Sequence, residues 1–198
     1  MAGTLDVVGS ERMEELRRVL VRGPMPVTVV IAGADPTWLA QYEAYAAALQ
    51  SLLGERLLLV EHIGSTSVPG LAAKPVIDIA AGIEDPDDES AYLPDLVTAG
   101  WELWVREPGH RCLRAEPAVQ RSDKEPTLPA NLHCYRSSSP EIGRYLLLRD
   151  RLRADPAARA RYADLKRSLA TRLWADTNLY ADAKGPLIRE LLGEPPEG

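Results

Sequence analysis

The feature that most constrains the fold is an apolar run, PVIDIAAGI, at residues 75–83. A strand that is apolar on both faces has to be covered on both faces, so the run predicts a buried strand inside a layered fold. One charged side chain, Asp78, interrupts it. A lone carboxylate against an apolar layer is costly unless it is paired, hydrogen-bonded or bound to metal. Because alternate residues share a strand face, Val76, Asp78 and Ala80 are expected on one face, where the sheet leads to a cleft.

The segments around this run alternate between helix and strand patterns. Three helices are expected to begin where a capping side chain precedes a proline, at Asp35-Pro36, Ser139-Pro140 and Asp155-Pro156. A leading helix is expected over 10–22, and a last one over 177–192 with an interruption near Gly185-Pro186. Strand patterns cover 27–32, 56–64, 75–83, 101–107, 111–116 and 130–135, and the polar stretch between 115 and 130 is predicted to be a loop.

These elements predict an α+β core with a mixed sheet of about five strands and a helical C-terminal third. Alternating apolar and polar residues on both sides of Pro108-Gly109 predict a hairpin within that sheet. We expect an N-terminal helix and linker over 1–26, an α/β core over 27–138, and a helical region packed on the core over 139–198.

Composition excludes several classes of function. The chain has 198 residues and a formal net charge of -6, which argues against non-specific nucleic-acid binding but leaves room for a local basic pocket. Cys112 and Cys134 form no CxxC pair and lie in apolar contexts, so both are expected to be small buried side chains. The chain shows no signal-peptide core and no apolar run of about 20 residues, so we expect a soluble cytoplasmic protein without a membrane partner.

The segment HIGSTSVPGLAAK, which precedes the buried strand, has the composition of an anion-binding turn. Gly64 allows a sharp turn after a strand, and Lys74 adds a compact positive charge before the next one. Free backbone amides at such a turn can hold phosphate, together with three adjacent hydroxyls: Ser65, Thr66 and Ser67. The alternative is that Asp78 caps a backbone turn and that the hydroxyls only tie down their own loop.

A wider pattern resembles a known family. EHIGSTSVPGLAAKPVIDI looks like the hallmark of the GrpB family (UPF0157), which belongs to the nucleotidyltransferase superfamily. The segments DPTWLAQYEA, NLHCY, RYLLLRDRLRADPAARARYADLKRSLA and LYADAKGPLIREL fall where such proteins have similar segments, so the resemblance covers about residues 27–192. It implies a nucleotidyltransferase-like mixed β-sheet core with a helical C-terminal cap.

The resemblance also implies a mechanism. In the superfamily, two carboxylates spaced Asp-x-Asp hold Mg²⁺ ions that bridge a nucleoside triphosphate, and a glycine-serine turn grips its phosphates. Here Gly64 and Ser65 correspond to the turn and Asp78 to the first metal ligand, but Ala80 stands where the second carboxylate is usual. One carboxylate with water and substrate phosphates can still hold one Mg²⁺.

Three acidic residues are candidates to replace the missing ligand. Glu61 lies beside the loop, whereas Glu84 and Asp85 lie beyond the strand end and are also explained as solvated turn residues. His133 lies on the strand that would carry a third carboxylate, on one face with Asn131 and Tyr135. It is a candidate general base or metal ligand, and a hydrogen-bonded structural histidine is the alternative.

Other polar residues near these motifs have less specific interpretations. His62 is interpreted as bracing the loop rather than as a catalyst. Arg111 and Arg114 are candidate phosphate partners, with surface ion pairing as the alternative. Four residues of the helical region match positions typical of the family, although helix amphipathicity also explains them: Arg149, Lys166, Tyr180 and Lys184. Of these, Lys184 is taken as a nucleotide-binding candidate.

Two hypotheses of function follow. The first is an enzyme that uses Mg²⁺ and ATP or another NTP to transfer a nucleotidyl group, AMP, to a small acceptor, or to activate a carboxylate as a ligase does. The second is a non-catalytic nucleotide- or anion-binding protein on the same fold, which the absent second carboxylate at Ala80 motivates. Non-nucleotide chemistry in the same cleft stays open. The expected partners are a nucleotide and a small molecule, and a homodimer is left open.

Overall fold

A five-stranded mixed sheet forms the centre of the protein. The computed structural model describes residues 3–117 and 128–195. The strands are ordered β2-β3-β6-β5-β4, and only the β3–β6 pair is parallel within this sheet. Their bounds are β2 (Leu59–Ile63), β3 (Ile77–Ile83), β4 (Glu102–Glu107), β5 (His110–Ala115) and β6 (Ala130–Arg136). The predicted hairpin at Pro108-Gly109 is present as β4 and β5, and the α+β fold class is confirmed.

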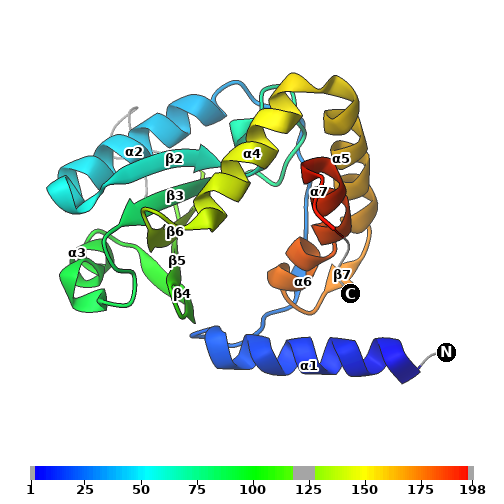
Figure 1. Ribbon diagram of the computed structural model, residues 1–198, viewed down its shortest axis with the longest axis horizontal. Helices are drawn as coiled ribbons and strands as arrows, with labels where there is room; N and C mark the ends of the chain where they lie inside the picture. The colour runs from blue at the N-terminus through cyan, green and yellow to red at the C-terminus, as the bar shows by residue number, and fades with distance from the viewer. Residues whose placement is uncertain (1–2, 118–127, 196–198) are drawn as a thin grey trace.

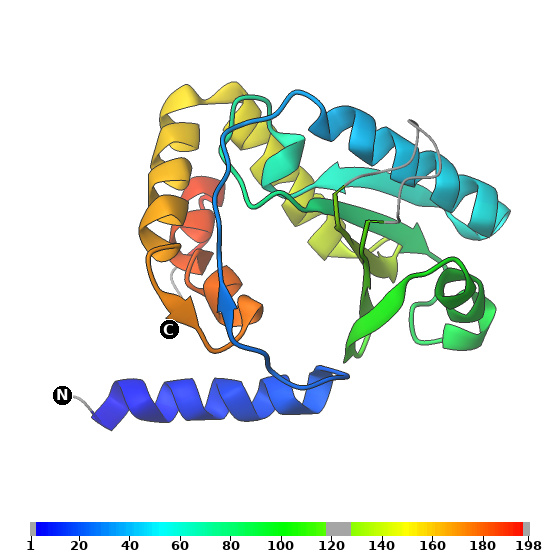
Figure 2. The ribbon, with the colours of Figure 1, turned by 180° about the vertical axis from the view of Figure 1, so that it is seen from behind.

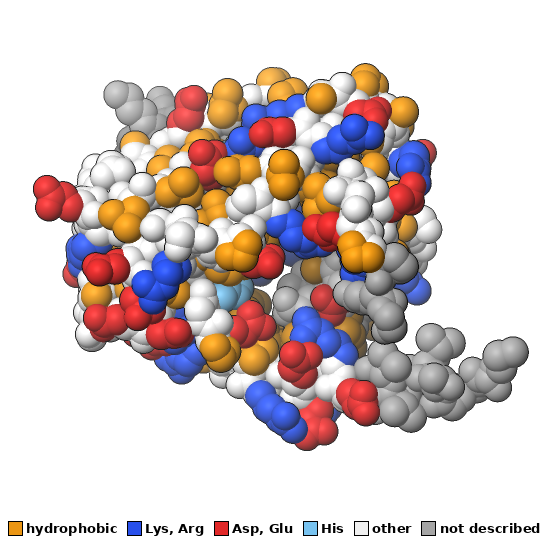
Figure 3. All heavy atoms as spheres, in the orientation of Figure 1, with side chains coloured by type: hydrophobic (Ala, Val, Ile, Leu, Met, Phe, Trp, Pro, Cys, Tyr) orange, Lys and Arg blue, Asp and Glu red, His pale blue; other side chains and the backbone are white. Residues whose placement is uncertain are grey.

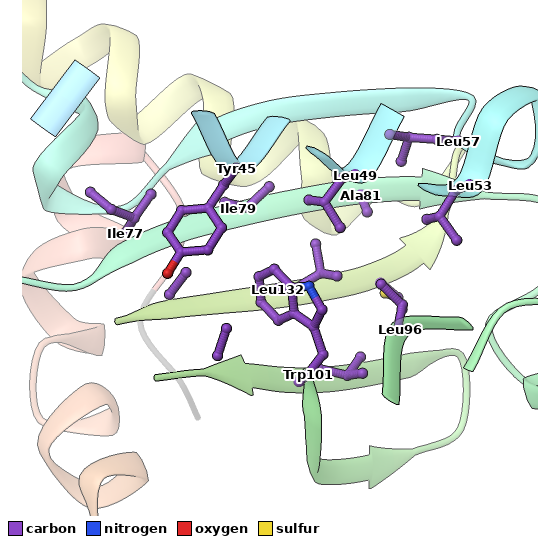
Figure 4. Packing of buried hydrophobic residues seen from close by; sticks show 14 of the residues in the cluster. Tyr45, Leu49, Leu53, Leu57, Ile77, Ile79, Ala81, Leu96, Trp101 and Leu132 are labelled. Carbon is purple, nitrogen blue, oxygen red and sulfur yellow. The ribbon is translucent and has the colours of Figure 1, made fainter. Parts of the chain in front are cut away.

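Helices α2 (Trp38–Leu53) and α3 (Leu93–Thr98) cover one face of this sheet (Figure 1). Leu49 and Leu53 of α2 pack with Ile79 of β3 and Leu132 of β6, and Figure 4 shows these side chains between the helix and the strands. They are completely or almost completely removed from solvent. Such burial of apolar surface is the main stabilising contribution to a fold of this kind.

Helix α4 (Pro140–Ala154) crosses the opposite face of the sheet. Ile142 of α4 packs there against Ile63, Ala80 and Tyr135 from three neighbouring strands. The apolar run of β3 is therefore covered on both faces, as its sequence predicts, because α2 and α4 lie on opposite sides of it. Asp78, the second residue of β3, is on the same face as Ala80 but outside the apolar cluster around Ile142.

The C-terminal helices form a separate layer beside the sheet. They are α5 (Pro156–Leu169), α6 (Thr177–Asp182) and α7 (Gly185–Leu192). The predicted caps are present, since Ser139 accepts from the Glu141 amide and Asp155 from the amides of Ala157 and Ala158. The interruption predicted near Gly185-Pro186 separates α6 from α7. The described residues also contain three short 3-10 turns: η1 (Gly54–Arg56), η2 (Ser65–Ser67) and η3 (Glu89–Ala91).

The strand predicted over 27–32 does not join the central sheet. Only β1 (Val27–Thr28) is a strand, and it pairs with β7 (Leu173–Trp174) of the C-terminal part. Val29 is buried against Leu169 and Tyr180 there. Figure 2 shows this segment running along the helical layer after α1 (Gly3–Val19). A β-branched run can pair with any available strand edge, and the segment at 27–28 lies beside the edge of β7 rather than beside the central sheet.

Two further expectations have different outcomes. Most of the loop predicted between 115 and 130 lies outside the described residues, which resume at 128. Among the helices of 3–117 and 128–195, none combines the length and apolar character needed to cross a bilayer.

The central packing gives a direct test. Leu132→Ala should lower the free energy of unfolding by about 2–5 kcal/mol, because a fully buried leucine at the centre of the sheet leaves a cavity. Urea unfolding measures this change. Leu147→Ala on α4 is the matched control, since that side chain is 65% exposed and its loss should change stability by less than about 0.5 kcal/mol. Equal effects of the two substitutions would contradict this packing.

Candidate functional site

A cleft of about 1020 Å³ lies between the uncovered part of the sheet and the C-terminal helices. Its walls come from α1, the β2–β3 connection, the sheet, and helices α4 to α7. Figure 3 shows a hollow here, with histidine, basic and acidic side chains around it. Polar residues that line the cleft include Ser65, Lys74, Asp78, Cys112, Arg114, Asn131, His133, Tyr162, Lys166 and Lys184.

The close approach of Gly64 to Asp78 fixes one end of the cleft. Gly64 follows β2 with φ of 68°, a conformation that favours glycine. A Cβ atom added at this position would lie 2.3 Å from Oδ2 of Asp78. The preceding residue, Ile63, is paired with Asp78 across β2 and β3. The absent side chain of Gly64 is therefore what lets the carboxylate lie against the backbone of the turn.

Asn131 holds the other carboxylate oxygen of Asp78. Its Nδ2 donates to Oδ1 over 2.8 Å, because Asn131 is the parallel-strand neighbour of Asp78 on β6. Burial raises the pKa of Asp78, while the Asn131 hydrogen bond and the nearby charges of Lys184, Lys74 and Lys166 act in the opposite direction. The Asp78 carboxylate therefore has one amide and three ammonium groups around it.

The three lysines come from distant parts of the chain. Lys74 precedes β3, Lys166 lies in α5, and Lys184 lies between α6 and α7. Lys166 is fully buried, and its Nζ donates to the Ala72 carbonyl over 2.5 Å. Burial, reinforced by the charges of Lys184 and Arg167, lowers the pKa of Lys166 to about 7. Burial also lowers the pKa values of Lys74 and Lys184. The lysines therefore crowd positive charge around one carboxylate.

The hydroxyls after Gly64 have different roles. Ser65 lines the cleft and is hydrogen-bonded to Tyr162 of α5. Thr66 donates to the Val76 carbonyl over 3.2 Å, and Ser67 donates to the Gly64 carbonyl over 2.6 Å. Both are buried and neither lines the cleft. The structure thus places Gly64 and Ser65 at the cleft, whereas Thr66 and Ser67 tie down their own loop.

His62 braces this loop, in agreement with the sequence interpretation. Its Nε2 lies 3.1 Å from Oγ1 of Thr66, and because that hydroxyl donates to Val76, the imidazole is the donor to it. The ring stacks on Tyr42 with centroids 4.5 Å apart. Burial, with the charges of Arg153 and Arg149, lowers the pKa of His62 to about 4, so the ring is neutral at pH 7. Arg153 in turn donates to the Ser67 carbonyl.

His133 lines the cleft from β6, on the same sheet face as Asp78. Its Nδ1 lies 3.2 Å from Nε2 of His110, and its Nε2 lies 4.0 Å from Sγ of Cys112. Burial, together with the charge of His110, lowers the pKa of His133 to about 3. The ring is therefore neutral at physiological pH, and its own basicity is low.

Glu61 and Arg111 do not line the cleft either. Glu61 is on the same sheet face as Asp78, paired with Ala80, but its carboxylate binds Arg149 of α4 over 2.8 Å. Arg111 points away from this face: it is buried and binds Glu89 and Asp87, with Nε of Arg111 2.5 Å from Glu89 Oε1. In this structure the Arg111 guanidinium therefore takes part in ion pairs outside the cleft.

Arg114 has the position that was expected of Arg111. The two residues are three apart on β5, so they project from opposite faces of the strand, and Arg114 lines the cleft. Its guanidinium lies over the Trp104 ring, 5.0 Å from the centroid. Asp85, the alternative metal ligand, pairs with Arg136 beyond the end of β3, and neither Asp85 nor Glu84 lines the cleft.

The donors around Asp78 do not fit a two-metal centre. Ala80 is buried in an apolar cluster, and Glu61 is neutralised by Arg149. Within the described residues, no group of three or more His, Cys, Asp or Glu side chains is arranged to hold a metal ion. The donor set fits only one carboxylate ligand to an ion that takes its other ligands from water and substrate phosphates, an arrangement that Mg²⁺ accepts.

The sequence reasoning missed several cleft residues. Tyr162 and Tyr145 lie in helices whose patterns contain many exposed arginines, and nothing in their spacing separates them from ordinary helix positions. His110, which does not line the cleft but contacts His133, was missed as well, although a usable signal existed. It begins the β5 strand, and a two-residue hairpin brings it opposite Glu107.

The Gly64–Asp78 contact leads to a second prediction. Gly64→Ala should cost about 1–2 kcal/mol for the left-handed backbone conformation and a further ~1–3 kcal/mol for the clash with the carboxylate. Gly70→Ala is the matched control, because Gly70 has φ of 77° in the same connection and no atom within 4 Å of the added Cβ. Urea unfolding of both variants isolates the clash. Equal stability losses would show that Gly64 and Asp78 are not in contact.

His62, which is buried, and His133, which is partly buried, predict a pH dependence of stability. The ordinary pKa of 6.5 applies to the unfolded chain, whereas His62 titrates at about 4 and His133 at about 3 in the fold. Below pH 6.5 the unfolded chain therefore binds protons that the folded one does not, so the free energy of unfolding falls as the pH falls. Each histidine should contribute a slope of about 1 kcal/mol per pH unit between about pH 6.5 and 5.

Urea unfolding across that pH range measures the slope. It should flatten by about half in His62→Gln and also in His133→Gln, since each substitution removes one of the two titrations. A slope that is unchanged in both variants would contradict the neutral state of these rings.

Comparison with known proteins agrees with this architecture. The family described as GrpB protein matches residues 28–194. A UPF0157 protein of Halalkalibacterium halodurans is 40% identical over 181 residues, which are 90% of this chain and 89% of that protein. The crystal structure of conserved protein GrpB from Enterococcus faecalis superposes with a TM-score of 0.65 at 32% identity, covering 83% of this chain and 98% of the other.

A longer protein contains a similar stretch. A dephospho-CoA kinase of Mycolicibacterium paratuberculosis is 32% identical over 192 residues, which are 87% of this chain but only 46% of that protein. The likeness to the first two proteins extends over most of their length. This chain belongs to the GrpB family.

Proposed function

We propose that the cleft binds the polyphosphate of a nucleoside triphosphate, with ATP as the first candidate, and that the protein transfers the nucleotidyl group to a small acceptor. The observation that carries this proposal is the convergence of Lys74, Lys166 and Lys184 on Asp78. Within the described chain none of the three forms an ion pair with a carboxylate, although each is at least partly buried. Like charges brought together in a buried place favour a ligand with several negative charges.

Each part of the cleft has a role in that reaction. The lysines bind the phosphates as point charges, and Ser65, held by Tyr162, offers a hydroxyl at the same end. The acceptor oxygen attacks the α-phosphorus, a new oxygen–phosphorus bond forms, and pyrophosphate leaves as the bond between the α-phosphorus and the bridging oxygen breaks. The lysines stabilise the negative charge that develops on the leaving group.

Mg²⁺ bound with the nucleotide would neutralise charge on the phosphates, with Asp78 as its protein ligand. Asn131 orients Asp78 for this role through the 2.8 Å hydrogen bond to Oδ1, which leaves Oδ2 beside the Gly64 turn.

The relative named dephospho-CoA kinase is consistent with a domain that works beside nucleotide chemistry, and this chain corresponds to about half of that protein. The chain contains no GxxxxGK[ST] segment, so a P-loop is not the means by which it would bind ATP. The kinase activity itself is therefore not proposed for this chain.

A second candidate is a non-catalytic anion-binding protein that uses the same lysines. The ion pair between Glu61 and Arg149 and the buried Ala80 favour it, because both remove carboxylates from the places where a second metal ligand is usual. The two candidates differ in their dependence on Mg²⁺.

Calorimetric titration with ATP, with and without Mg²⁺, tests the proposal. We expect binding to be stronger with Mg²⁺ and this gain to disappear in Asp78→Asn, which keeps the size of the side chain but removes the charge. Binding that is identical with and without Mg²⁺ would support the anion-binding candidate. No binding of ATP under either condition would contradict both.

A lysine substitution tests the phosphate contact. Lys184→Met should weaken ATP binding about 10- to 100-fold, the effect of losing one hydrogen bond between charged groups. Arg17→Met is the control, because this exposed residue of α1 does not line the cleft. If both variants bind ATP as the unmodified protein does, the lysine cluster is not the phosphate site.

A further inference from the structure

Three side chains at the edge of the cleft form a continuous hydrogen-bonded chain. Glu107 Oε2 lies 2.8 Å from Nδ1 of His110, and Nε2 of His110 lies 3.2 Å from Nδ1 of His133. The fold imposes this arrangement, since Glu107 and His110 close the β4–β5 hairpin as paired residues. The planes of the two imidazole rings are nearly parallel, with an interplanar angle of 5° and centroids 5.4 Å apart. Of these three residues, His133 lines the cleft, whereas His110 and Glu107 do not.

The order of donors in this chain follows from the charge of Glu107. An ionised carboxylate only accepts, so Nδ1 of His110 carries a proton. When His110 is neutral, its Nε2 is an acceptor and Nδ1–H of His133 donates to it. Nε2 of His133 then has a free lone pair on the side of Cys112, whose Sγ is 4.0 Å away. The carboxylate thereby sets the tautomer of a ring two hydrogen bonds away.

A second protonation state has the same heavy-atom geometry. When His110 is protonated, both of its ring nitrogens donate, and Nδ1 of His133 becomes the acceptor while its Nε2 carries the proton. The two states differ by one proton added at one end of the chain and one moved inside it. No side chain has to move between them.

We propose that Glu107 and His110 are positioning residues that make His133 a proton relay for the reaction in the cleft. Nε2 of His133 takes the proton that the acceptor group loses as it attacks phosphorus. Nδ1–H of His133 passes to Nε2 of His110, and the resulting His110 imidazolium is held by the Glu107 carboxylate. One proton enters the chain, one is transferred within it, and the positive charge ends next to Glu107.

The relay avoids placing a positive charge on His133. His133 is partly buried, and as an isolated base it would have to become a cation in a place where desolvation and His110 both oppose its charge. Passing a proton onward leaves His133 neutral and puts the charge on His110, which has a carboxylate partner. The side chain of His110 is 14% exposed and that of Glu107 is 36% exposed, so the charge ends nearer to solvent.

Other titratable and charged groups surround the relay and can affect its pH dependence. Tyr135 stacks on His110 with centroids 4.4 Å apart, and Tyr145 of α4 lies at the outer side of His133 with centroids 6.1 Å apart. Cys112 adjoins His133, and the charge of Arg12 from α1 acts on Glu107. Burial raises the pKa values of Cys112, Tyr135 and Tyr145, so these three groups stay neutral while the relay titrates.

Nitrogen-15 NMR of the histidine rings tests the relay without any nucleotide. The chain has only three histidines, so single His→Gln substitutions assign every signal. At alkaline pH we expect His110 and His133 both to carry the proton on Nδ1. As the pH falls, His133 should change to the Nε2–H tautomer with the same midpoint at which His110 takes up its proton. A His133 that carries its proton on Nε2 at alkaline pH, or two unrelated midpoints, would overturn the proposal.

Glu107→Gln tests whether the charge of Glu107 controls the protonation of His110 or whether Glu107 only holds the hairpin together. The glutamine oxygen can still accept from His110, but without charge, so the shared midpoint should fall by about one pH unit or more. Glu102→Gln on the same strand is the control, since Glu102 pairs with Arg22 and does not contact His110. A midpoint that is equal in Glu107→Gln and Glu102→Gln would contradict the role of Glu107.

The part of the inference that concerns catalysis rests on the proposed function. If ATP turnover is found, Glu107→Gln should lower kcat about 10²- to 10⁴-fold with little change in ATP affinity, as expected for loss of general-base catalysis. A variant with normal kcat would overturn the relay even if ATP binding is confirmed. Failure of ATP to bind would instead overturn the proposed function and leave the NMR result to stand alone.

Discussion

The contact between the Asp78 carboxylate and the turn at Gly64 is the constraint on which the rest of the site depends. Gly64 directly follows β2, Asp78 is the second residue of β3, and Asn131 is the second residue of the parallel neighbour β6, so the ends of three strands meet at one carboxylate. Any side chain at residue 64 would displace Asp78 from this position, because even a methyl group would overlap Oδ2. The central sheet then gives the cleft its floor, and α1 and helices α4 to α7 add walls.

The side chains around the Asp78 carboxylate are mainly positive, although the whole chain is negative. The protein has a net charge of -6, yet Asp78 is surrounded by three lysines that the fold collects from separate elements. Burying ammonium groups is unfavourable, and the lowered pKa of Lys166 is a sign of that cost. A fold keeps such a cluster at some expense of stability, which is the usual condition of a binding site rather than of a structural core. An acidic chain with a basic cleft also directs anions to that cleft.

The elements with strong local signals were predictable from the sequence. The caps at Ser139 and Asp155 and the doubly covered strand β3 depend on near neighbours along the chain, so their patterns suffice. Whether a candidate residue reaches the cleft depends instead on which face of its strand it occupies. Arg111 and Arg114 have the same local context, and only the register of β5 shows that Arg111 faces the buried pairs with Glu89 and Asp87. The strand predicted over 27–32 failed for the related reason that its partner, β7, lies far away in the sequence.

Ala80 is the residue at which the fold and the proposed chemistry meet. It pairs with Glu61 on one side and His133 on the other, and it is fully buried with Ile63 and Ile142. A carboxylate at this position would enter an apolar cluster under α4, away from the lysines that surround Asp78. The second acidic position has therefore been built into the contact between sheet and helix, and restoring an aspartate there would destabilise that contact before it created a metal site. The carboxylates that remain for the proposed reaction are then Asp78 and, through the proton chain, Glu107, which lies on the same face of the sheet three strands away.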